Sequence, residues 1–285
     1  MDASDLPSGL RLTELGERRV AVENLGDAGV RDVVFGGQLL AQSVIFAHQL
    51  HPGRSVRTLY SVFARSARVS ARTELVAEPL HGGRSLAAET ITAMQGDRLC
   101  CRSLVMLDTG DEDLIAHAAA APDLGPPERA PEGQGFMAYP GTEVRVVDGV
   151  DTWSVDAPTG PPALQVWLRW TRGEATGALG QALLAYATDG FFIGAAMRPH
   201  AGIGQDLSHQ DISTGVLAHS MTFHAPVSAH EWLLVAFESP YAGAGRSHGR
   251  GQVFDQRGGL IASITQDNLI RRLPESHTAN RVRTM

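Results

Sequence analysis

The 285-residue chain contains no lysine, and all 24 of its basic side chains are arginine. They are outnumbered by 31 acidic residues, so the formal net charge is −7 and the isoelectric point lies near 5.9. Because nucleic-acid binding requires a concentrated positive surface, we expect no nucleic-acid partner. Arginine does bind phosphate groups in a bidentate manner, so a ligand with a nucleotide part is compatible with this composition.

Cysteine and long hydrophobic runs are scarce as well. The only two cysteines are neighbours, Cys100 and Cys101, poorly placed for a disulfide and too few for a zinc site. We therefore expect buried, reduced thiols and no metal or other cofactor. No stretch approaches the roughly 18 consecutive apolar residues of a membrane-spanning helix, and the N-terminus lacks the pattern of a signal peptide. The sequence predicts a cytoplasmic protein without a membrane span.

Residues 111–162 have almost no aliphatic periodicity and are rich in Ala, Pro, Gly and acidic residues. This composition is typical of a linker, and we expect some order around residues 142–147. The linker would separate an N-terminal unit at residues 1–110 from a C-terminal unit at residues 163–285.

The two units resemble each other. When Arg246 is placed on Arg84, the neighbouring glycine and serine residues align, and so do two apolar strands further on. Both copies show a glycine-rich turn, an alternating strand, a tight turn and a second strand. This order predicts a β-hairpin with long arms in each unit.

Each unit also has a helix candidate, at residues 35–50 and residues 177–197, and Gly37 in the first matches Gly180 in the second. Small and apolar residues surround both helices, which predicts burial. Four strands are expected after each helix. A strongly curved antiparallel sheet can enclose such a helix, so we predict an α+β double hotdog fold: two tandem hotdog units, each an antiparallel sheet wrapped around a central helix.

Four segments point to a known family. They are FGGQLLAQS at residues 35–43, YATDGFF at residues 186–192, HSMTFHAP at residues 219–226 and SITQDNL at residues 263–269. In order and spacing they resemble the type II acyl-CoA thioesterases (TesB-like), over roughly residues 30–110 and 165–272. The resemblance implies a homo-oligomer with the double hotdog fold that hydrolyses acyl-CoA without a metal or a covalent intermediate.

The resemblance also implies which residues hold the attacking water. The family's carboxylate falls on Asp189 and its glutamine on Gln266, whereas the family's hydroxyl position is occupied by Val216. The acidic residue that usually precedes the family's histidine is replaced by Ala218. Val216 cannot hold water through its side chain.

A hydroxyl from a neighbouring residue would replace the one missing at Val216 if the strand shifted by one period. Thr214 and Ser213 are the candidates, because residues two apart on a strand face the same way.

The residues themselves support a site in the second unit. A carboxylate inside an apolar helix, such as Asp189, is costly to bury, and burial raises its pKa toward that of a general base. The alternative is that Asp189-Gly190 simply ends the helix. Gln266 lies on an alternating apolar strand, where it either orients water or bonds to the backbone. The first-unit counterparts, Phe46 and Leu104, are apolar, so we expect one site per chain.

Further residues are expected to line this site. Gly36 and Gly37 at a helix start are suited to present N–H groups to an oxyanion, although close helix packing explains them equally well. Phe191 and Phe192 are predicted to lie beside the acyl chain, and His219 to form hydrogen bonds beneath the helix.

Three other interpretations fit poorly. Ser247 lies in a G-x-S-x-G motif, but a strand rather than a helix is expected to follow it, unlike the nucleophile elbow of hydrolases. The spacing of His219, His224 and His230 does not let them converge on a metal. A hotdog hydratase would need a histidine where this chain has Gly194. Two hypotheses stay open: an acyl-CoA thioesterase, or an acyl-CoA or acyl-carrier binding protein that does not hydrolyse its ligand.

Overall fold

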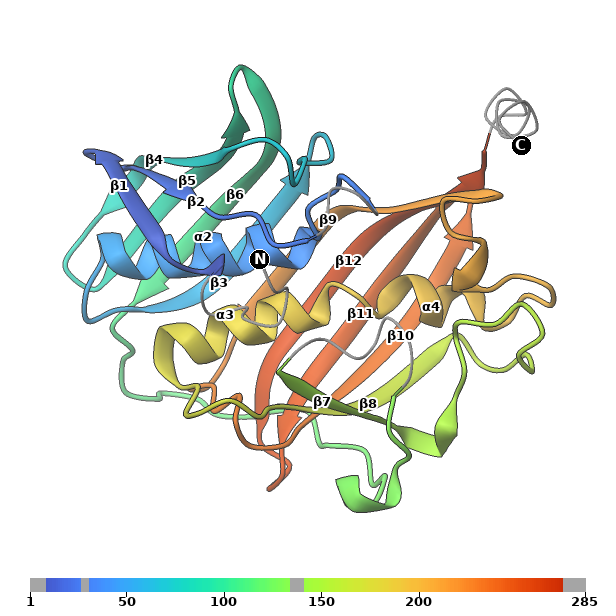
Figure 1. Cartoon of the computed structure of the whole chain (residues 1–285). Helices are drawn as coiled ribbons and strands as arrows, with labels where there is room; N and C mark the ends of the chain where they lie inside the picture. Colours follow the sequence, from blue (N-terminus) through green and yellow to red (C-terminus); the bar gives the residue numbers. More distant parts are fainter. Residues whose placement is uncertain (1–8, 27–30, 134–140, 274–285) are drawn as a thin grey trace.

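The computed structural model describes residues 9–26, 31–133 and 141–273. Figure 1 shows the helices lying side by side on the concave side of one long, curved sheet. Within the described residues, the first half consists of β1 (Leu12–Gly16), β2 (Arg19–Val22), α2 (Gly36–Leu50), β3 (Ser55–Phe63), β4 (Thr73–Gly82), β5 (Leu86–Gln95) and β6 (Arg98–Asp108).

The second half repeats this order. It consists of β7 (Thr142–Val146), β8 (Ala163–Trp170), α3 (Gly177–Thr188), α4 (Phe192–Met197), β9 (Ile212–Phe223), β10 (Leu233–Gly243), β11 (Arg246–Asp255) and β12 (Leu260–Arg272). Short 3₁₀ turns occur at Pro127–Arg129, Val147–Gly149 and Gln205–Leu207. Both halves therefore carry two strands before the helix and four after it, which confirms the internal repeat.

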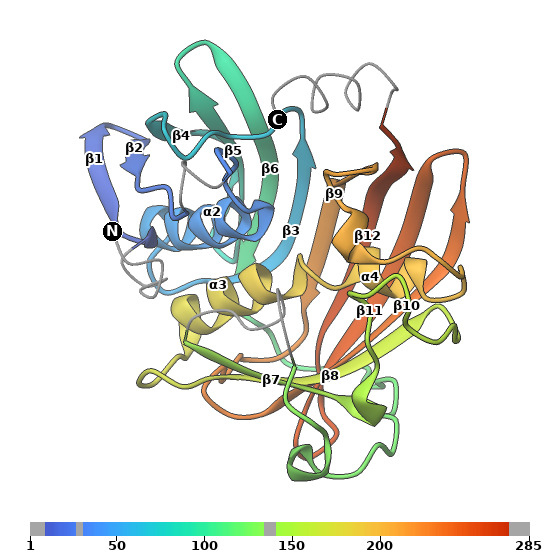
Figure 2. The same cartoon turned by 45° about the vertical axis from the view of Figure 1, so that its right-hand side comes forward.

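All twelve strands form one antiparallel sheet in the order β1-β2-β4-β5-β6-β3-β9-β12-β11-β10-β8-β7. Corresponding strands follow one another from either edge inward, so the two halves meet at β3 and β9 (Figure 2). Tyr60 lies opposite Ser220 at this junction, and Ser61 lies opposite His219. The predicted α+β double hotdog architecture is confirmed, with the two sheets fused edge to edge.

The helices α2 and α3 run antiparallel against each other over the sheet. Gly37 near the start of α2 lies against the carbonyl of Tyr186 near the end of α3. At the other end, His48 Nε2 lies 2.8 Å from Gln181 Oε1. A Cβ atom on Gly37 would stand only 2.4 Å from the Tyr186 oxygen, so glycine is what permits this close approach.

The structure corrects one expected helix and adds strands. Residues 177–197 are not one helix: α3 ends at Thr188 and α4 begins at Phe192. The break falls on Asp189-Gly190, a pair that favours helix termination. The strands β1, β2 and β8 were not expected, because β1 is mostly exposed and β8 follows directly on a proline-rich stretch.

Part of the predicted linker is packed rather than extended. The strand β7 pairs with β8, and residues further upstream cover the outer face of the second-half sheet. There, Ala130, Trp167 and Trp232 belong to a second, smaller apolar cluster, against which Ala121 and Leu124 pack. Cys100 and Cys101 are both buried and unpaired with each other. In the described part of the chain, no helix is long and apolar enough to cross a membrane.

We predict that Gly37→Ala destabilises the fold through the contact between α2 and α3. A methyl group placed 2.4 Å from a backbone oxygen forces the helices apart, which is expected to lower the free energy of unfolding by about 1–3 kcal/mol. Gly82→Ala is the matched control, because a methyl group at that position would meet no heavy atom within 4 Å. Urea denaturation followed by circular dichroism measures both; equal midpoints would contradict the close-packing argument.

Candidate active site

The break between α3 and α4 places Asp189 in the core. Asp189 caps the C-terminus of α3, and only 3% of its surface is exposed. Both interpretations of this residue from the sequence therefore apply together: the helix ends here, and the carboxylate is buried. Burial raises the pKa of Asp189 to about 7, and a hydrogen bond from the Gly37 N–H opposes part of that rise. The carboxyl group is therefore poised to gain or lose a proton near neutral pH.

The start of α2 faces this carboxylate. A Cβ atom on Gly36 would lie 2.7 Å from Asp189 Oδ2 and close to the ring of Phe63. Glycine at this position therefore leaves room beside the carboxyl group. The structure brings Gly36 and Gly37 of the first half to Asp189 of the second, with the Gly37 N–H directed at the carboxylate.

A row of buried polar side chains crosses the inner face of the sheet beneath the helices. Ser103, Ser61, His219 and Gln266 are successive cross-strand neighbours on β6, β3, β9 and β12. Each is at most 1% exposed. Ser61 Oγ lies 2.7 Å from Ser103 Oγ, and His219 Nδ1 lies 2.7 Å from Gln266 Oε1. This row of polar side chains therefore extends across the junction between the two halves.

Gln266 links this row to the helix break. Its Nε2 donates to the backbone carbonyl of Asp189 at 3.3 Å and to Asn268 Oδ1 at 2.8 Å. Because a backbone carbonyl only accepts, it fixes which end of the amide carries the nitrogen. The amide oxygen must then face His219, so the His219 proton sits on Nδ1. The sequence placed Asp189 and Gln266 in one site, and the structure brings them together.

His219 is neutral in this environment. Burial lowers the pKa of His219 to about 4, although the hydrogen bond with Gln266 acts in the opposite direction. Its Nδ1 lies 3.8 Å from Asp189 Oδ1. Within the described residues, Asp189 Oδ1 and His219 Nε2 are buried without a hydrogen-bond partner. These two unsatisfied acceptors mark where the site offers a polar ligand its contacts.

Sequence reasoning missed Asn268. This side chain is fully buried, accepts from Gln266, and donates through Nδ2 to Ser247 Oγ at 3.2 Å. The available signal was alternation, since Ile264, Gln266 and Asn268 lie two residues apart on one apolar strand. Ser247 itself lies on β11, a strand, so it does not sit on a nucleophile elbow.

Val216 is the cross-strand neighbour of Asn268. A bulge between Asp267 and Asn268 leaves Leu217 without a partner on β12. Past the bulge, Thr214 pairs with Ile270. Neighbours across a ladder share a face, so Val216 and Thr214 lie on the same side as Asn268. Thr214 is therefore two residues further toward the rim than Val216, and Ser213 faces the opposite side.

Phe191 and Phe192 are packed into the second-half core. Both are at most 1% exposed, and both contact the ring of Phe237 at centroid distances of 5.1 and 4.7 Å. Phe192 fills the space above Gly249 and Gly251 of β11. Their position beside an acyl chain stays a prediction.

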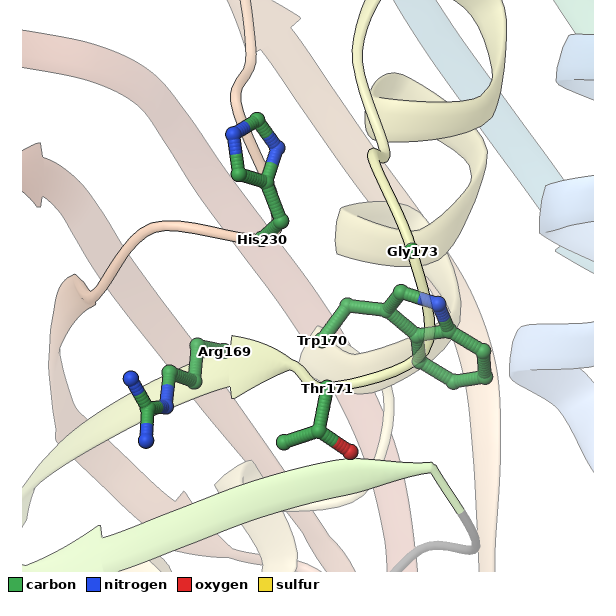
Figure 3. A pocket seen from close by; sticks show the side chains of 5 residues that line it. All are labelled: Arg169, Trp170, Thr171, Gly173 and His230. Atoms are coloured by element: carbon green, nitrogen blue, oxygen red, sulfur yellow. The ribbon is translucent and has the colours of Figure 1, made fainter.

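The remaining histidines lie elsewhere. His224 Nε2 is 2.8 Å from Ser263 Oγ, and His230 Nδ1 is 3.3 Å from the Ala175 N–H. His230 lines a surface pocket of about 320 Å³ with Arg169, Trp170 and Thr171 (Figure 3). This pocket lies near the start of α3, and the twelve residues of that helix place it about 18 Å from Asp189. It is therefore separate from the buried polar row.

Comparison with known proteins agrees with this arrangement. The model of the acyl-CoA thioesterase N-terminal domain matches residues 26–107, and that of the acyl-CoA thioesterase C-terminal domain matches residues 116–270. Acyl-CoA thioesterase 2 of Haemophilus influenzae is 30% identical over 268 residues, covering 86% of this chain and 90% of that protein. Human acyl-coenzyme A thioesterase 8 is 25% identical over 265 residues, covering 85% of this chain and 82% of that protein.

A solved structure shows the same fold. The acyl-CoA thioesterase II TesB2 from Mycobacterium marinum is 26% identical, with a TM-score of 0.78 over 95% of this chain and 99% of that one. Both halves of the chain match the family's domain models in the family's order. The chain therefore belongs to the acyl-CoA thioesterase family, a family of thioester hydrolases with the double hotdog fold.

Proposed function

We propose that this protein hydrolyses fatty acyl-CoA to a free acid and CoA, with Asp189 as the general base. The observation that supports this most directly is a buried carboxyl group whose pKa is about 7, placed against the glycine-rich start of α2. A base of this pKa accepts a proton from water without being permanently protonated at neutral pH.

The reaction would proceed in two steps. Water attacks the thioester carbonyl carbon while Asp189 takes one of its protons, and the carbonyl oxygen becomes an oxyanion. The C–S bond then breaks, and the CoA sulfur takes the proton from Asp189. The Gly37 N–H is already directed at the carboxylate, so we assign the oxyanion contact to the Gly36 N–H at the positive end of α2.

Gln266 has a positioning role in this proposal. Its amide nitrogen donates to the Asp189 carbonyl and to Asn268, while its oxygen accepts from His219. It thereby holds the helix break, the His219 tautomer and Asn268 in one arrangement. Asn268 takes the place of the absent hydroxyl as the third polar group, because it lies directly across from Val216.

A second function is favoured by specific observations. Val216 and Ala218 both lack the polar atoms of the family pattern, and both amide donors of Gln266 are engaged within the protein. These features suit a protein that binds acyl-CoA or acyl-carrier ligands without cleaving them. Tight binding with no release of thiol would support this alternative.

We predict that Asp189→Asn lowers kcat/KM for acyl-CoA by about 10²–10⁴-fold, because it removes the base. Gln266→Ala is expected to cost less, on the order of 10–100-fold, since it acts through positioning. Thiol release from acyl-CoAs of several chain lengths measures both. Asp267→Asn is the matched control, because this carboxylate is exposed and pairs with His248 instead. Unchanged rates in both site variants would remove these residues from the mechanism.

The pH dependence provides an independent check on Asp189. We expect kcat/KM to rise with pH around a midpoint near 7, because only the ionised carboxylate accepts a proton. A pH-independent rate between pH 5 and 9 would contradict the assignment of the base.

The contribution of Asp189 to the free energy of unfolding should fall with rising pH, whereas kcat/KM should rise. The folded pKa of about 7 lies above the usual 3.8, so this group stabilises the fold at low pH, and its contribution is lost between about pH 4 and 7. Asp189→Asn should therefore be more stable than the wild type at pH 8, on the order of 4 kcal/mol, and the difference should vanish near pH 4. The depressed pKa of His219 destabilises both proteins alike as pH falls from 6.5 to 4. Urea titrations at each pH measure the difference.

The double variant Val216→Thr, Ala218→Asp separates the two functions. If the wild type hydrolyses slowly or not at all because these groups are missing, the variant should gain at least about tenfold in kcat. No gain would show that the two departures do not limit the reaction, and would favour Asn268 as their replacement.

A further inference from the structure

Three polar side chains from the two halves of the chain meet beside the first residues of β9. Arg31 comes from the segment before α2, His209 from the turn after Gln205–Leu207, and Thr214 from β9. Arg31 Nη2 lies 3.5 Å from His209 Nδ1, and His209 Nε2 lies 3.5 Å from Thr214 Oγ1. The buried site described above uses none of these three residues.

The charge of this cluster is not balanced by an acid. The neighbouring Asp32 directs its two carboxylate oxygens to the Ser70 N–H and hydroxyl, each at 2.8 Å. Within the described residues, Arg31 takes part in no ion pair of 4 Å or less. Arg31 and His209 are both more than a third exposed; their partial burial lowers the pKa of Arg31 and, followed by the charge of Arg31, that of His209. A bound anion would oppose both pKa shifts, because a negative charge favours the protonated forms of arginine and histidine.

The backbone holds His209 in place. Its φ of 63° is in the left-handed region, which a non-glycine residue adopts at a cost of roughly 1 kcal/mol or more. The conformation is fixed because the His209 N–H donates to the Ile212 carbonyl at 2.7 Å. The turn thus aims the imidazole at Arg31 and Thr214 before any ligand arrives.

Both chain segments lead from this cluster to the reacting groups. Arg31 precedes the residues that place Gly36 against Asp189. On β9, Thr214 shares its face with Val216, and roughly 15 Å of strand separates Thr214 from His219. Acyl-CoA has a matching layout, because an extended arm separates its thioester from the phosphates of its nucleotide end.

We propose that Arg31 and Thr214, held in place by His209, bind a phosphate group at the nucleotide end of CoA while the thioester lies at Asp189. This proposal rests on acyl-CoA being the ligand, as proposed above. Arg31 donates to His209 Nδ1, so the His209 Nε2–H faces the Thr214 oxygen. The remaining guanidinium N–H groups and the Thr214 hydroxyl proton are then directed at the phosphate oxygens.

The test compares two thioesters with the same acyl group: acyl-CoA and acyl-pantetheine, which lacks the phosphates. Arg31→Ala should lower kcat/KM for acyl-CoA by about 10–100-fold, the usual size of losing a charge-assisted contact. Its kcat/KM for acyl-pantetheine should stay within about twofold of the wild type, which also shows that the variant is folded. His209→Ala and Thr214→Val should shift the same ratio in the same direction by smaller factors.

The matched control is Arg257→Ala. Arg257 is an exposed arginine in the turn between β11 and β12, near the end of β9 that lies opposite to Thr214. It should leave both rates unchanged. Equal losses on both thioesters in Arg31→Ala would overturn the proposal, because the residue would then act on the reaction or the fold. So would an unchanged rate on acyl-CoA, which would place the phosphates elsewhere.

If neither thioester is cleaved, the hydrolytic proposal fails while this one is tested by binding. Isothermal titration should then show that Arg31→Ala binds CoA more weakly than the wild type does, while both proteins bind pantetheine equally well. Titration with inorganic phosphate separates a general anion site from one that needs the whole cofactor. Binding of phosphate with no effect of Arg31→Ala on CoA would also contradict the assignment.

Discussion

The hydrogen bond from the Gln266 amide to the Asp189 carbonyl joins the interrupted helix to the sheet. A helix that stops inside a core leaves backbone carbonyls that must find donors. Gln266 supplies one of them, and the same contact fixes the orientation of its own amide. Because the Gln266 nitrogen points at Asn268, the Asn268 side chain must present its oxygen there. Because the Gln266 oxygen points at His219, the His219 proton lies on Nδ1. The architecture of the helix end and the protonation pattern of the site thus have one origin.

This arrangement is costly as well as specific. Asp189 Oδ1 and His219 Nε2 are buried acceptors with no partner in the described structure, and unsatisfied buried acceptors reduce stability. Burial also shifts the pKa values of the two groups in opposite directions: it raises that of Asp189 and lowers that of His219. A core selected only for stability would replace them with apolar side chains. Their presence agrees with a site that stabilises a reacting polar group.

Much of the fold follows from the sequence because it depends on local pattern. The repeat, the apolar helices and the long hairpins were all readable from periodicity and turns. The broken helix was not, because the apolar pattern continues across Asp189-Gly190 and only the three-dimensional fit decides whether the pair ends the helix. The strands β1, β2 and β8 were missed, because β1 is mostly exposed and β8 follows directly on a proline-rich stretch.

The site divides in the same way. Asp189 and Gln266 could be named because they are polar residues in apolar segments. Asn268 belongs to the site because it accepts a hydrogen bond from Gln266. Ser61 belongs to it because β3 pairs with β9, a strand distant in sequence. The direction of the Gly37 N–H toward the carboxylate depends on how closely α2 approaches α3. The contacts of Ser61 and Gly37 arise from the packing of the two halves and leave no trace in either half alone, whereas the Asn268 contact lies within β12.

The covalent connection between the two halves has a consequence for how the copies diverge. Two separate copies of one gene product must each fit an identical partner, so a change that helps one face harms its twin. When the copies are joined in a single polypeptide, they meet at a high effective concentration, and the first copy always pairs with the second. One helix is thus free to break at Asp189 while its counterpart runs unbroken through Phe46. Covalent fusion converts a symmetric pair into a division of labour.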